Sequence, residues 1–279
     1  MSRTLSILAG LVLFAAPAAA ADEKATTIRW HGQSFFEVVS KDGVRVVLDP
    51  HAIPAFGRNL VTADLVLCSH HHTDHTRTEV VENIKELQKE KRVYIGTEEK
   101  AMRPQYIDVK GEYKGVKYYN ARLFHDDVEG MKRGLNTAMV LEVDGLRIVH
   151  LGDLGHRLTD QQLKKIGKVD VLMIPIGGVY TINGIVAHDV IDQLKPTRYI
   201  LPMHYGVPGY SELLNLNETK FLDDVEPKLI RRYDSTNELR VDAGVKPPKE
   251  PLIVLLNYDN KRDKGDKSRA GLPRGQGTG

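Results

Sequence analysis

The chain has 279 residues, of which 41% are hydrophobic and 27% charged, an ordinary globular balance that predicts one large domain or two fused halves. Its one cysteine, Cys68, excludes an internal disulfide, so the fold must depend on its core and on any metal that it binds. The formal net charge of +2 favours neither a nucleic acid nor a membrane surface as a partner.

The first 20 residues are typical of a cleaved signal peptide. Arg3 supplies a positive charge, residues 5–16 form an apolar run, and APAAAAD offers small-residue cleavage sites near Ala20 or Ala21. The run is shorter than the ~20 residues that a membrane span usually needs, which disfavours an uncleaved anchor. We therefore expect an exported protein, periplasmic or secreted, with no membrane span after cleavage.

After the signal segment, short β-rich runs alternate with helical segments. Asp-Gly stands between two such runs in SKDGVR and again in EVDGLR, which predicts β-hairpins at corresponding places of two halves, residues 26–110 and 111–210. The runs are rich in Val, Ile, Leu and Tyr and are bounded by turn-forming residues. The predicted strands are Thr27–Trp30, Phe35–Val39, Val44–Leu48, Leu65–Ser69, Val93–Gly96, Val116–Leu123, Ala138–Val143, Arg147–Leu151, Val171–Ile174, Tyr199–Met203 and Leu252–Leu256.

Helical patterns are fewer. The segment Thr78–Lys91 has apolar residues at helical spacing, and Thr76 with Glu79 forms a capping-box pattern at its start. Shorter or weaker patterns lie at 159–165, 187–194 and 211–225. Hairpins combined with strand–helix alternation predict α/β layers, in which two sheets pack together and helices cover the outside. The sequence contains no glycine-rich phosphate loop and no GxSxG elbow, so those two enzyme classes gain no support.

The C-terminal segment differs in charge from the rest. Residues 261–279 carry six basic and two acidic residues, whereas residues 21–260 carry 32 basic and 35 acidic residues, a balance of −3. A basic tail can contact anionic polymers or membranes, but this composition is more typical of a solvated, disordered end. The expected organisation is a signal peptide at 1–20, one domain at 21–260 and a disordered basic tail at 261–279.

The stretch HHHTDH, from His70 to His75, directly follows a predicted buried strand. An extended chain sends alternate residues to one side, so His70, His72 and Asp74 share a face, and His75 joins them where the chain turns. Neutral imidazoles around a divalent metal are satisfied ligands, whereas an unpaired cluster repels itself when protonated. The pattern predicts a metal site at a strand end, with His71 pointing away. The aspartate and the flanking elements disfavour the alternative of a solvated histidine-rich loop.

Further ligands must come from distant parts of the chain. Three residues closely follow predicted strands: His125 after YYNARLF, Asp153 in HLGDLG and His204 in YILPMHYG. His150 instead lies within its strand, three residues before Asp153, so it is expected to face the other way as a packed or surface residue. The seven candidate ligands are His70, His72, Asp74, His75, His125, Asp153 and His204.

These motifs, in this order between about residues 28 and 206, resemble the metallo-β-lactamase-fold hydrolases. The segments WHGQSFFEV, VVLDP, NTAMVLEVDG, HLGDLGH, IPIGGVYTI and LPMHYG are similar to the lactonase- and phosphodiesterase-like branch, to which ascorbate-phosphate lactonase belongs. The resemblance implies a four-layer αβ/βα sandwich, with two mixed sheets covered by helices.

The resemblance also implies two metal positions: His70, His72 and His125 hold the first, Asp74, His75 and His204 hold the second, and Asp153 bridges them. Nitrogen and carboxylate donors without thiolate suit zinc first, with manganese, iron or nickel as alternatives. Two ions ~3.5–4 Å apart share a water, lower its pKa toward ~7 and polarise a carbonyl or phosphoryl oxygen. Besides its role as a ligand, Asp74 is the candidate to receive the proton of the nucleophile.

Supporting residues have two interpretations each. Asp49 in VVLDP is a candidate acceptor for a ligating imidazole, or a plain turn former. His156 in GDLGH is a candidate substrate contact, or a surface residue. Tyr180 in IGGVYTING is a candidate substrate contact together with backbone N–H groups of this loop, or part of a turn. Cys68 is expected to be a small buried hydrophobe rather than a ligand.

The remaining candidates are weaker. Asp126 and Asp127 are rival ligands next to His125, and His31 and His51 are weak candidates for the site. No role is assigned to His188.

The predicted function is a metal-dependent hydrolase that uses metal-bound hydroxide to cleave an ester, lactone or phosphodiester bond, with acyl-ester cleavage favoured. The alternative is a non-enzymatic exported metal-binding protein, a carrier or a sensor, which needs no open coordination position. A small-molecule substrate is expected rather than a nucleic acid, because the acidic balance of residues 21–260 gives no sign of a basic groove. The sequence determines neither the natural substrate, the metal in the cell, the oligomeric state nor the role of the tail.

Overall fold

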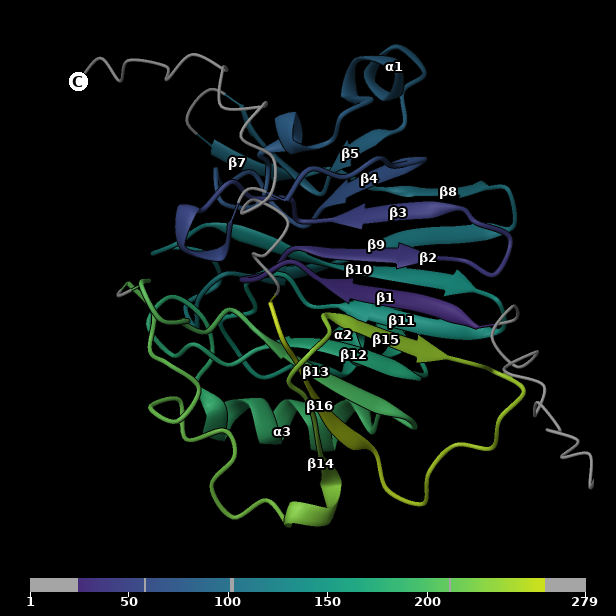
Figure 1. Ribbon diagram of the computed structural model, residues 1–279. Coiled ribbons are helices and arrows are strands. Elements are labelled where there is room, and N and C mark those ends of the chain that lie inside the picture. The colour runs from purple at the N-terminus through teal and green to yellow at the C-terminus, as the bar shows by residue number, and fades with distance from the viewer. Residues whose placement is uncertain (1–24, 58, 101–102, 211, 259–279) are drawn as a thin grey trace, which may run out of the picture.

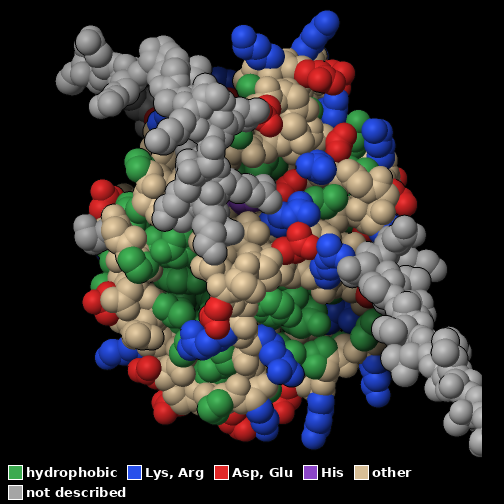
Figure 2. Space-filling model, in the orientation of Figure 1, with side chains coloured by type: hydrophobic (Ala, Val, Ile, Leu, Met, Phe, Trp, Pro, Cys, Tyr) green, Lys and Arg blue, Asp and Glu red, His purple; other side chains and the backbone are tan. Residues whose placement is uncertain are grey.

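Two mixed β-sheets form the body of the protein (Figure 1). The computed structural model describes residues 25–57, 59–100, 103–210 and 212–258. The predicted signal peptide and the predicted basic tail lie outside these ranges. Within them, no helix is long and apolar enough to cross a membrane. Positive and negative side chains are both scattered over the face shown in Figure 2.

The first sheet has the strand order β15-β1-β2-β3-β4-β5. The strands β1, β2 and β3 run antiparallel, and β3, β4 and β5 run parallel. The β2–β3 pairing confirms the hairpin predicted at SKDGVR. The bounds are β1 Thr26–Trp30, β2 Phe36–Val39, β3 Arg45–Leu48, β4 Leu65–Cys68, β5 Val93–Ile95 and β15 Glu238–Val241.

The second sheet has the order β14-β16-β13-β12-β11-β10-β9-β8 and repeats the pattern of the first. Its strands β9, β10 and β11 are antiparallel and β11, β12 and β13 are parallel, so the hairpin predicted at EVDGLR is also confirmed. A separate ribbon pairs β6 (Thr97–Lys100) with β7 (Arg103–Tyr106). The bounds are β8 Lys110–Tyr113, β9 Val116–Phe124, β10 Leu135–Val143, β11 Leu146–His150, β12 Val171–Pro175, β13 Tyr199–Met203, β14 Ile230–Tyr233 and β16 Leu252–Leu256.

Alternation along the strands of the first sheet separates two apolar layers. On β4, Leu65 and Leu67 belong to the large core that includes the second sheet, whereas Val66 and Cys68 belong to a smaller cluster with Leu87. This is the period of two that a strand with both faces buried requires. Cys68 is fully buried in the smaller cluster, as expected of a small hydrophobe, and it faces away from the core between the sheets.

The helices cover the sheets only sparsely. The longest, α3 (Gly184–Leu194), begins at the N-cap Asn183 and buries Ala187, Val190 and Leu194 in the large core. The others are short: α1 (Ile84–Lys89), α2 (Asp160–Ile166) and the 3₁₀ turns Pro54–Phe56, Thr78–Val80 and Pro227–Leu229. The α/β layering is therefore as expected, but the described part of the protein is mostly sheet.

Only the second half of the helix predicted at 78–91 exists. Val81 forms a bridge with Val61, and the Asn83 side chain hydrogen-bonds both the N–H and the carbonyl of Ala63, so this segment is held against neighbouring chain until α1 begins. The predicted cap is also wrong, because the Thr76 hydroxyl donates to the carbonyl of His72. Such long-range contacts override local helical spacing.

The helix predicted at 211–225 is wrong, and turns take its place. The Asn215 side chain accepts hydrogen bonds from the backbone N–H groups of Asn217 and Glu218, which closes a turn. Lys220 and Asp224 then have φ values of 58° and 62°, a left-handed conformation that a right-handed helix cannot contain.

Ion pairs join three strands of the first sheet, and they predict that the stability of the fold depends on pH. Arg29 on β1 contacts Glu37 on β2 at 2.9 Å and Glu238 on β15 at 2.8 Å. Burial acts to raise the pKa of Glu37, but hydrogen bonds with His31 and Arg29 lower it below its ordinary value. A depressed folded pKa gives stability that is present above the unfolded pKa of about 4.3 and is lost as pH falls through the folded pKa.

We expect Glu37→Gln to cost about 1–3 kcal/mol of unfolding free energy at pH 7, because a buried charged acceptor is lost. The cost should shrink when urea unfolding of both proteins is repeated at successively lower pH below the ordinary glutamate value. A difference that stays constant down to acid pH would show that the charge of Glu37 does not stabilise the fold.

Candidate metal centre

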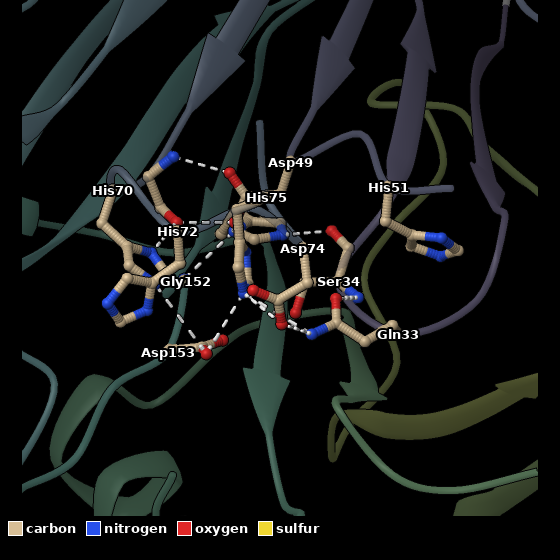
Figure 3. Close-up of polar contacts among 12 residues, drawn as sticks. Gln33, Ser34, Asp49, His51, His70, His72, Asp74, His75, Gly152 and Asp153 are labelled. Carbon is tan, nitrogen blue, oxygen red and sulfur yellow. Dashed lines mark hydrogen bonds and ion pairs between the residues drawn. The ribbon is translucent and has the colours of Figure 1, made fainter. Parts of the chain in front are cut away.

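The HHHTDH stretch leaves the end of β4 and turns beneath the edge of the sheet (Figure 3). His70 and His75 are fully buried, while His72 and Asp74 are partly exposed. His71 is exposed, as the alternation predicts, and its backbone N–H donates to the Thr97 hydroxyl at 2.9 Å. The local pattern thus turns four of the five ligand-type side chains to one side.

Asp153, which follows β11, lies below His70, His72 and His75 in the view of Figure 3. Its Oδ2 is 3.1 Å from His75 Nε2, 3.1 Å from His204 Nε2 and 3.2 Å from His125 Nε2. His70 Nε2 lies 4.0 Å from the same oxygen. Ring nitrogens from both halves of the chain therefore converge on one carboxylate.

The structure brings together all seven residues that the sequence put forward, in two groups of donor atoms. In each group, the donor atoms lie within 4.8 Å of one another. His125 follows β9 and His204 follows β13, so the second sheet supplies these two imidazoles from separate strand ends. The groups are His70, His72 and His125, and Asp74, His75, Asp153 and His204.

The donor atoms fit a divalent cation. Asp153 Oδ1 is buried and has no hydrogen-bond partner among the described residues, which costs free energy unless a cation satisfies it. His70 Nε2 and His72 Nδ1 lie 3.0 Å apart, two ring nitrogens directed at the same small space. Imidazole nitrogen and carboxylate oxygen are the donor set of zinc and similar metals.

The protonation states of the histidines also fit a site for a divalent cation. Burial lowers the pKa of His70 and of His72, so both imidazoles are neutral and can donate a lone pair. Burial also acts to lower the pKa of His75, but the surrounding carboxylates, Asp153 first, raise it well above its usual value. A proton on His75 therefore balances these carboxylates, in the position where a bound cation would supply the charge.

The two carboxylates of the cluster stay ionised. Burial acts to raise the pKa of Asp153, but His204 and His75 hold it well below its ordinary value. Burial likewise acts to raise the pKa of Asp74, and His75 lowers it to about 2. Both side chains are thus in the form that binds a cation.

Asp49, for which the sequence left two interpretations, accepts hydrogen bonds that support the histidine cluster. It has a positive φ of 45° and accepts hydrogen bonds from the Ser69 N–H at 2.6 Å, the Ser69 hydroxyl at 2.6 Å and His75 Nδ1 at 2.8 Å. Ser69 Oγ also lies 2.9 Å from His70 Nδ1. Asp49 therefore orients His75 directly and His70 through Ser69, a residue that the sequence reasoning missed.

Gln33 is a second residue that the sequence reasoning missed. The side-chain Nε2 of Gln33 donates to Asp74 Oδ2 at 3.0 Å. The backbone carbonyl of Gln33 accepts from the backbone N–H of His204 at 3.2 Å. Gln33 lies in the turn between β1 and β2 and has a positive φ of 46°. His204, which follows β13, also has a positive φ, of 57°. The signal available was a polar residue after Gly32 in WHGQSFF, within the motif that carries the family resemblance.

His156 does not contact the cavity as one of its two interpretations expected. Its Nε2 accepts from the N–H of Phe124 at 3.1 Å and its Nδ1 donates to the carbonyl of Arg157 at 2.6 Å. Both ring nitrogens are therefore used within the fold, where they hold the strand end that precedes His125.

Three other histidines are packing residues. His150 is buried, with Nε2 at 2.8 Å from the carbonyl of Ser34, which agrees with its predicted packed role. His51 lies at 3.0 Å from the carbonyl of Gly32, and His188 stacks on Phe221. The remaining weak candidates, His31, Asp126 and Asp127, do not join either group of donor atoms among the described residues.

A cavity of about 600 Å³ opens beside the cluster. Its lining includes His72, Asp74, His125, Asp153 and His204, so the cavity adjoins both groups of donor atoms. Three loops also contribute to the lining, with residues that include Lys132, Arg133, Tyr180, Tyr210 and Glu212. Tyr180, with 44% of its surface exposed, thus stands where a substrate contact was expected.

Gly177 leads to a prediction about ligand placement. A Cβ atom at this position would clash with the carbonyl oxygen of His204, a backbone atom that cannot move away cheaply. We expect Gly177→Ala to displace His204, to cost about 1–3 kcal/mol of stability and to weaken metal binding, measured by thermal unfolding and metal titration. The control is Gly244→Ala, where the nearest atom is the Asp242 carboxylate at 3.2 Å. Equal metal affinity in both variants would contradict the prediction.

Comparison with known proteins agrees with this geometry. A family model described as a β-lactamase superfamily domain matches residues 27–204. The chain is similar to the crystal structure of a Thermotoga maritima protein assigned to the zinc-dependent hydrolases of the metallo-β-lactamase superfamily. The two are 31% identical, the match covers 82% of this chain and 97% of that one, and the TM-score is 0.57. The chain therefore belongs to the metallo-β-lactamase superfamily, as a metal-dependent hydrolase.

The chain is also similar to curated relatives named UPF0173 metal-dependent hydrolases. A UPF0173 metal-dependent hydrolase of Nitratidesulfovibrio vulgaris (strain DP4) is 28% identical over 221 residues, which are 72% of this chain and 87% of the relative. A UPF0173 metal-dependent hydrolase of Thermococcus onnurineus is 29% identical over 198 residues, 64% of this chain and 84% of the relative. Neither name specifies a substrate.

Proposed function

We propose that this protein is a binuclear zinc hydrolase that cleaves lactones or other carboxylic esters of small molecules. The observation that carries the proposal is the convergence of two groups of donor atoms on Asp153 beside an open cavity. His70, His72 and His125 would hold one ion, Asp74, His75 and His204 the other, and Asp153 both. Divalent cations bound there supply Lewis acidity and lower the pKa of coordinated water.

The residues of the chain orient and polarise this site. Asp49 and Ser69 fix the rings of His75 and His70, so their Nε2 atoms face Asp153. Gln33 fixes the Asp74 carboxylate. With a pKa of about 2, Asp74 is a weak base near neutral pH, so it serves better as a ligand than as a proton acceptor.

The cavity favours an enzyme over a carrier or sensor. A storage site needs its ligands closed around the metal, whereas a volume of about 600 Å³ in contact with the donors admits a small molecule. We therefore prefer hydrolysis to the non-enzymatic alternative.

Acyl-ester cleavage is preferred to phosphodiester cleavage, with which it competes. The support is the similarity of segments such as HLGDLGH and IPIGGVYTI to the branch that includes ascorbate-phosphate lactonase. The acidic balance of residues 21–260 further disfavours a nucleic-acid substrate. The signal-peptide pattern of residues 1–20 supports action outside the cytoplasm, in the periplasm or beyond the cell.

The test combines elemental analysis with chromogenic lactone, phosphodiester and cephalosporin substrates on one preparation. We expect two zinc ions per chain and lactone turnover that chelation removes and zinc restores. Full metal content with no turnover of any substrate would favour the carrier, and turnover of the phosphodiester alone would favour the second bond class.

A further inference from the structure

A buried carboxylate organises the loop between β9 and β10. Asp126, only 3% exposed, accepts four backbone hydrogen bonds: from Val128 at 2.9 Å and Gly130 at 2.8 Å on Oδ1, and from Lys132 at 2.8 Å and Arg133 at 2.7 Å on Oδ2. Four charge-assisted bonds to one side chain fix the loop backbone. Asp126 therefore fixes the backbone positions from which the cationic side chains of Lys132 and Arg133 extend.

Arg133 reaches from this loop to the loop after β12. One of its terminal nitrogens donates to the carbonyl of Val179 at 3.0 Å, and its guanidinium carbon lies 5.8 Å from the centre of the Tyr180 ring. A guanidinium has five N–H donors in a fork that matches a carboxylate or a phosphate. The carbonyl of Val179 uses only part of this capacity, and no carboxylate of the described residues lies within ion-pair distance of Arg133.

Lys132 and Arg133 both line the cavity that adjoins the candidate metal ligands. Arg133 and Lys132 share its lining with His72 and His125, while Glu212 lines it from another loop. Lys132 is partly balanced by Asp127 at 3.8 Å. Within the described part of the chain, Arg133 is thus a positive group without a balancing carboxylate, and it lines the same cavity as candidate ligands.

We propose that the substrate carries an anionic group, a carboxylate or a phosphate, in addition to the bond that is cleaved, and that Arg133 binds this group with help from Lys132. This inference rests on the proposed hydrolase function and specifies its substrate class. Asp126 is a positioning residue, since it acts through the backbone of Arg133. A purely structural role of Arg133, tying two loops together, would affect stability but not the choice of substrate.

Three 4-nitrophenyl esters of similar size test the proposal with zinc-loaded protein. The butyrate is neutral, the monosuccinate carries a terminal carboxylate, and the 3-phosphonopropionate carries a phosphonate in the same place. We expect a higher kcat/KM for at least one anionic ester than for the butyrate. The better of the two anionic esters identifies the group as carboxylate-like or phosphate-like.

The diagnostic variant is Arg133→Gln, with Arg122→Gln as a matched control. Arg122 is also an exposed arginine, 5.2 Å from the ring centre of Tyr106, and it donates to Asp108 at 3.0 Å, but it does not line this cavity. We expect Arg133→Gln to lower the anionic-to-neutral ratio of kcat/KM by about 10- to 100-fold, and the control to leave it unchanged. An unchanged ratio in Arg133→Gln would overturn the proposal.

A binding measurement separates this proposal from the hydrolase itself. Calorimetric titration of zinc-loaded wild type and Arg133→Gln with monomethyl succinate and methyl butyrate needs no turnover. Preferential binding of the anion that is lost in Arg133→Gln, without hydrolysis of any ester, would support the anion site and reject the hydrolase. Turnover with no anion preference in either measurement would reject the anion site alone.

Discussion

Replacement of Asp153 by alanine is expected to remove both bound metal and hydrolysis. Asp153 Oδ2 lies within 3.2 Å of ring nitrogens of His75, His125 and His204, so the variant loses the one oxygen that both groups of donors face. Lewis-acid stabilisation is worth several kcal/mol, so a fall in kcat/KM of about 1,000-fold or more is expected. Elemental analysis and ester turnover of the same sample measure the two losses.

The control for this variant is Asp108→Ala, which removes an exposed carboxylate that pairs with Arg122. It should keep full metal content and full activity. Turnover retained by Asp153→Ala after complete metal loss would mean that the chemistry does not depend on this cluster.

Asp49→Ala should have the second largest effect, mainly on stability and metal affinity. The change leaves three buried donors unsatisfied, the N–H and hydroxyl of Ser69 and Nδ1 of His75. Loss of one partner of a buried charged pair costs about 3–5 kcal/mol. The ring of His75 also loses its orientation, for which a fall in metal affinity of about 10- to 100-fold is expected.

Asp170→Ala provides a control that separates the two effects. Asp170 is also a buried carboxylate, and it accepts hydrogen bonds from the Arg147 N–H at 3.0 Å and the Thr197 hydroxyl at 2.7 Å, away from the cluster. This variant should lose stability in urea unfolding but bind zinc with unchanged affinity. Equal zinc affinities in Asp49→Ala and Asp170→Ala would contradict the orienting role of Asp49.

Residues that lie at strand ends were predictable from the sequence. A buried apolar run followed by HHHTDH defines both the strand and the side to which its ligands turn, and His125, Asp153 and His204 each follow an apolar run. Gln33 and Ser69 were not predictable in this way. Their roles depend on a positive φ or on a partner far along the chain, and neither leaves a periodic pattern.

The same contrast holds for the fold. All the predicted strands are apolar runs, and each lies in a sheet. The strands that were missed, such as β7 and β14, are mostly exposed and carry charged or polar side chains, so they lack the apolar alternation that marks a strand. For the segment 78–91 the sequence predicted too much regular structure. Its local spacing is helical, but its tertiary contacts with Val61 and Ala63 replace the first part of the helix.

The candidate ligands are divided between the two repeated halves of the chain. The first sheet contributes His70, His72, Asp74 and His75, and the second contributes His125, Asp153 and His204. Neither half expressed by itself would carry a complete set of either group of donor atoms. A fragment that contains only one half is therefore not expected to bind metal or to hydrolyse a substrate.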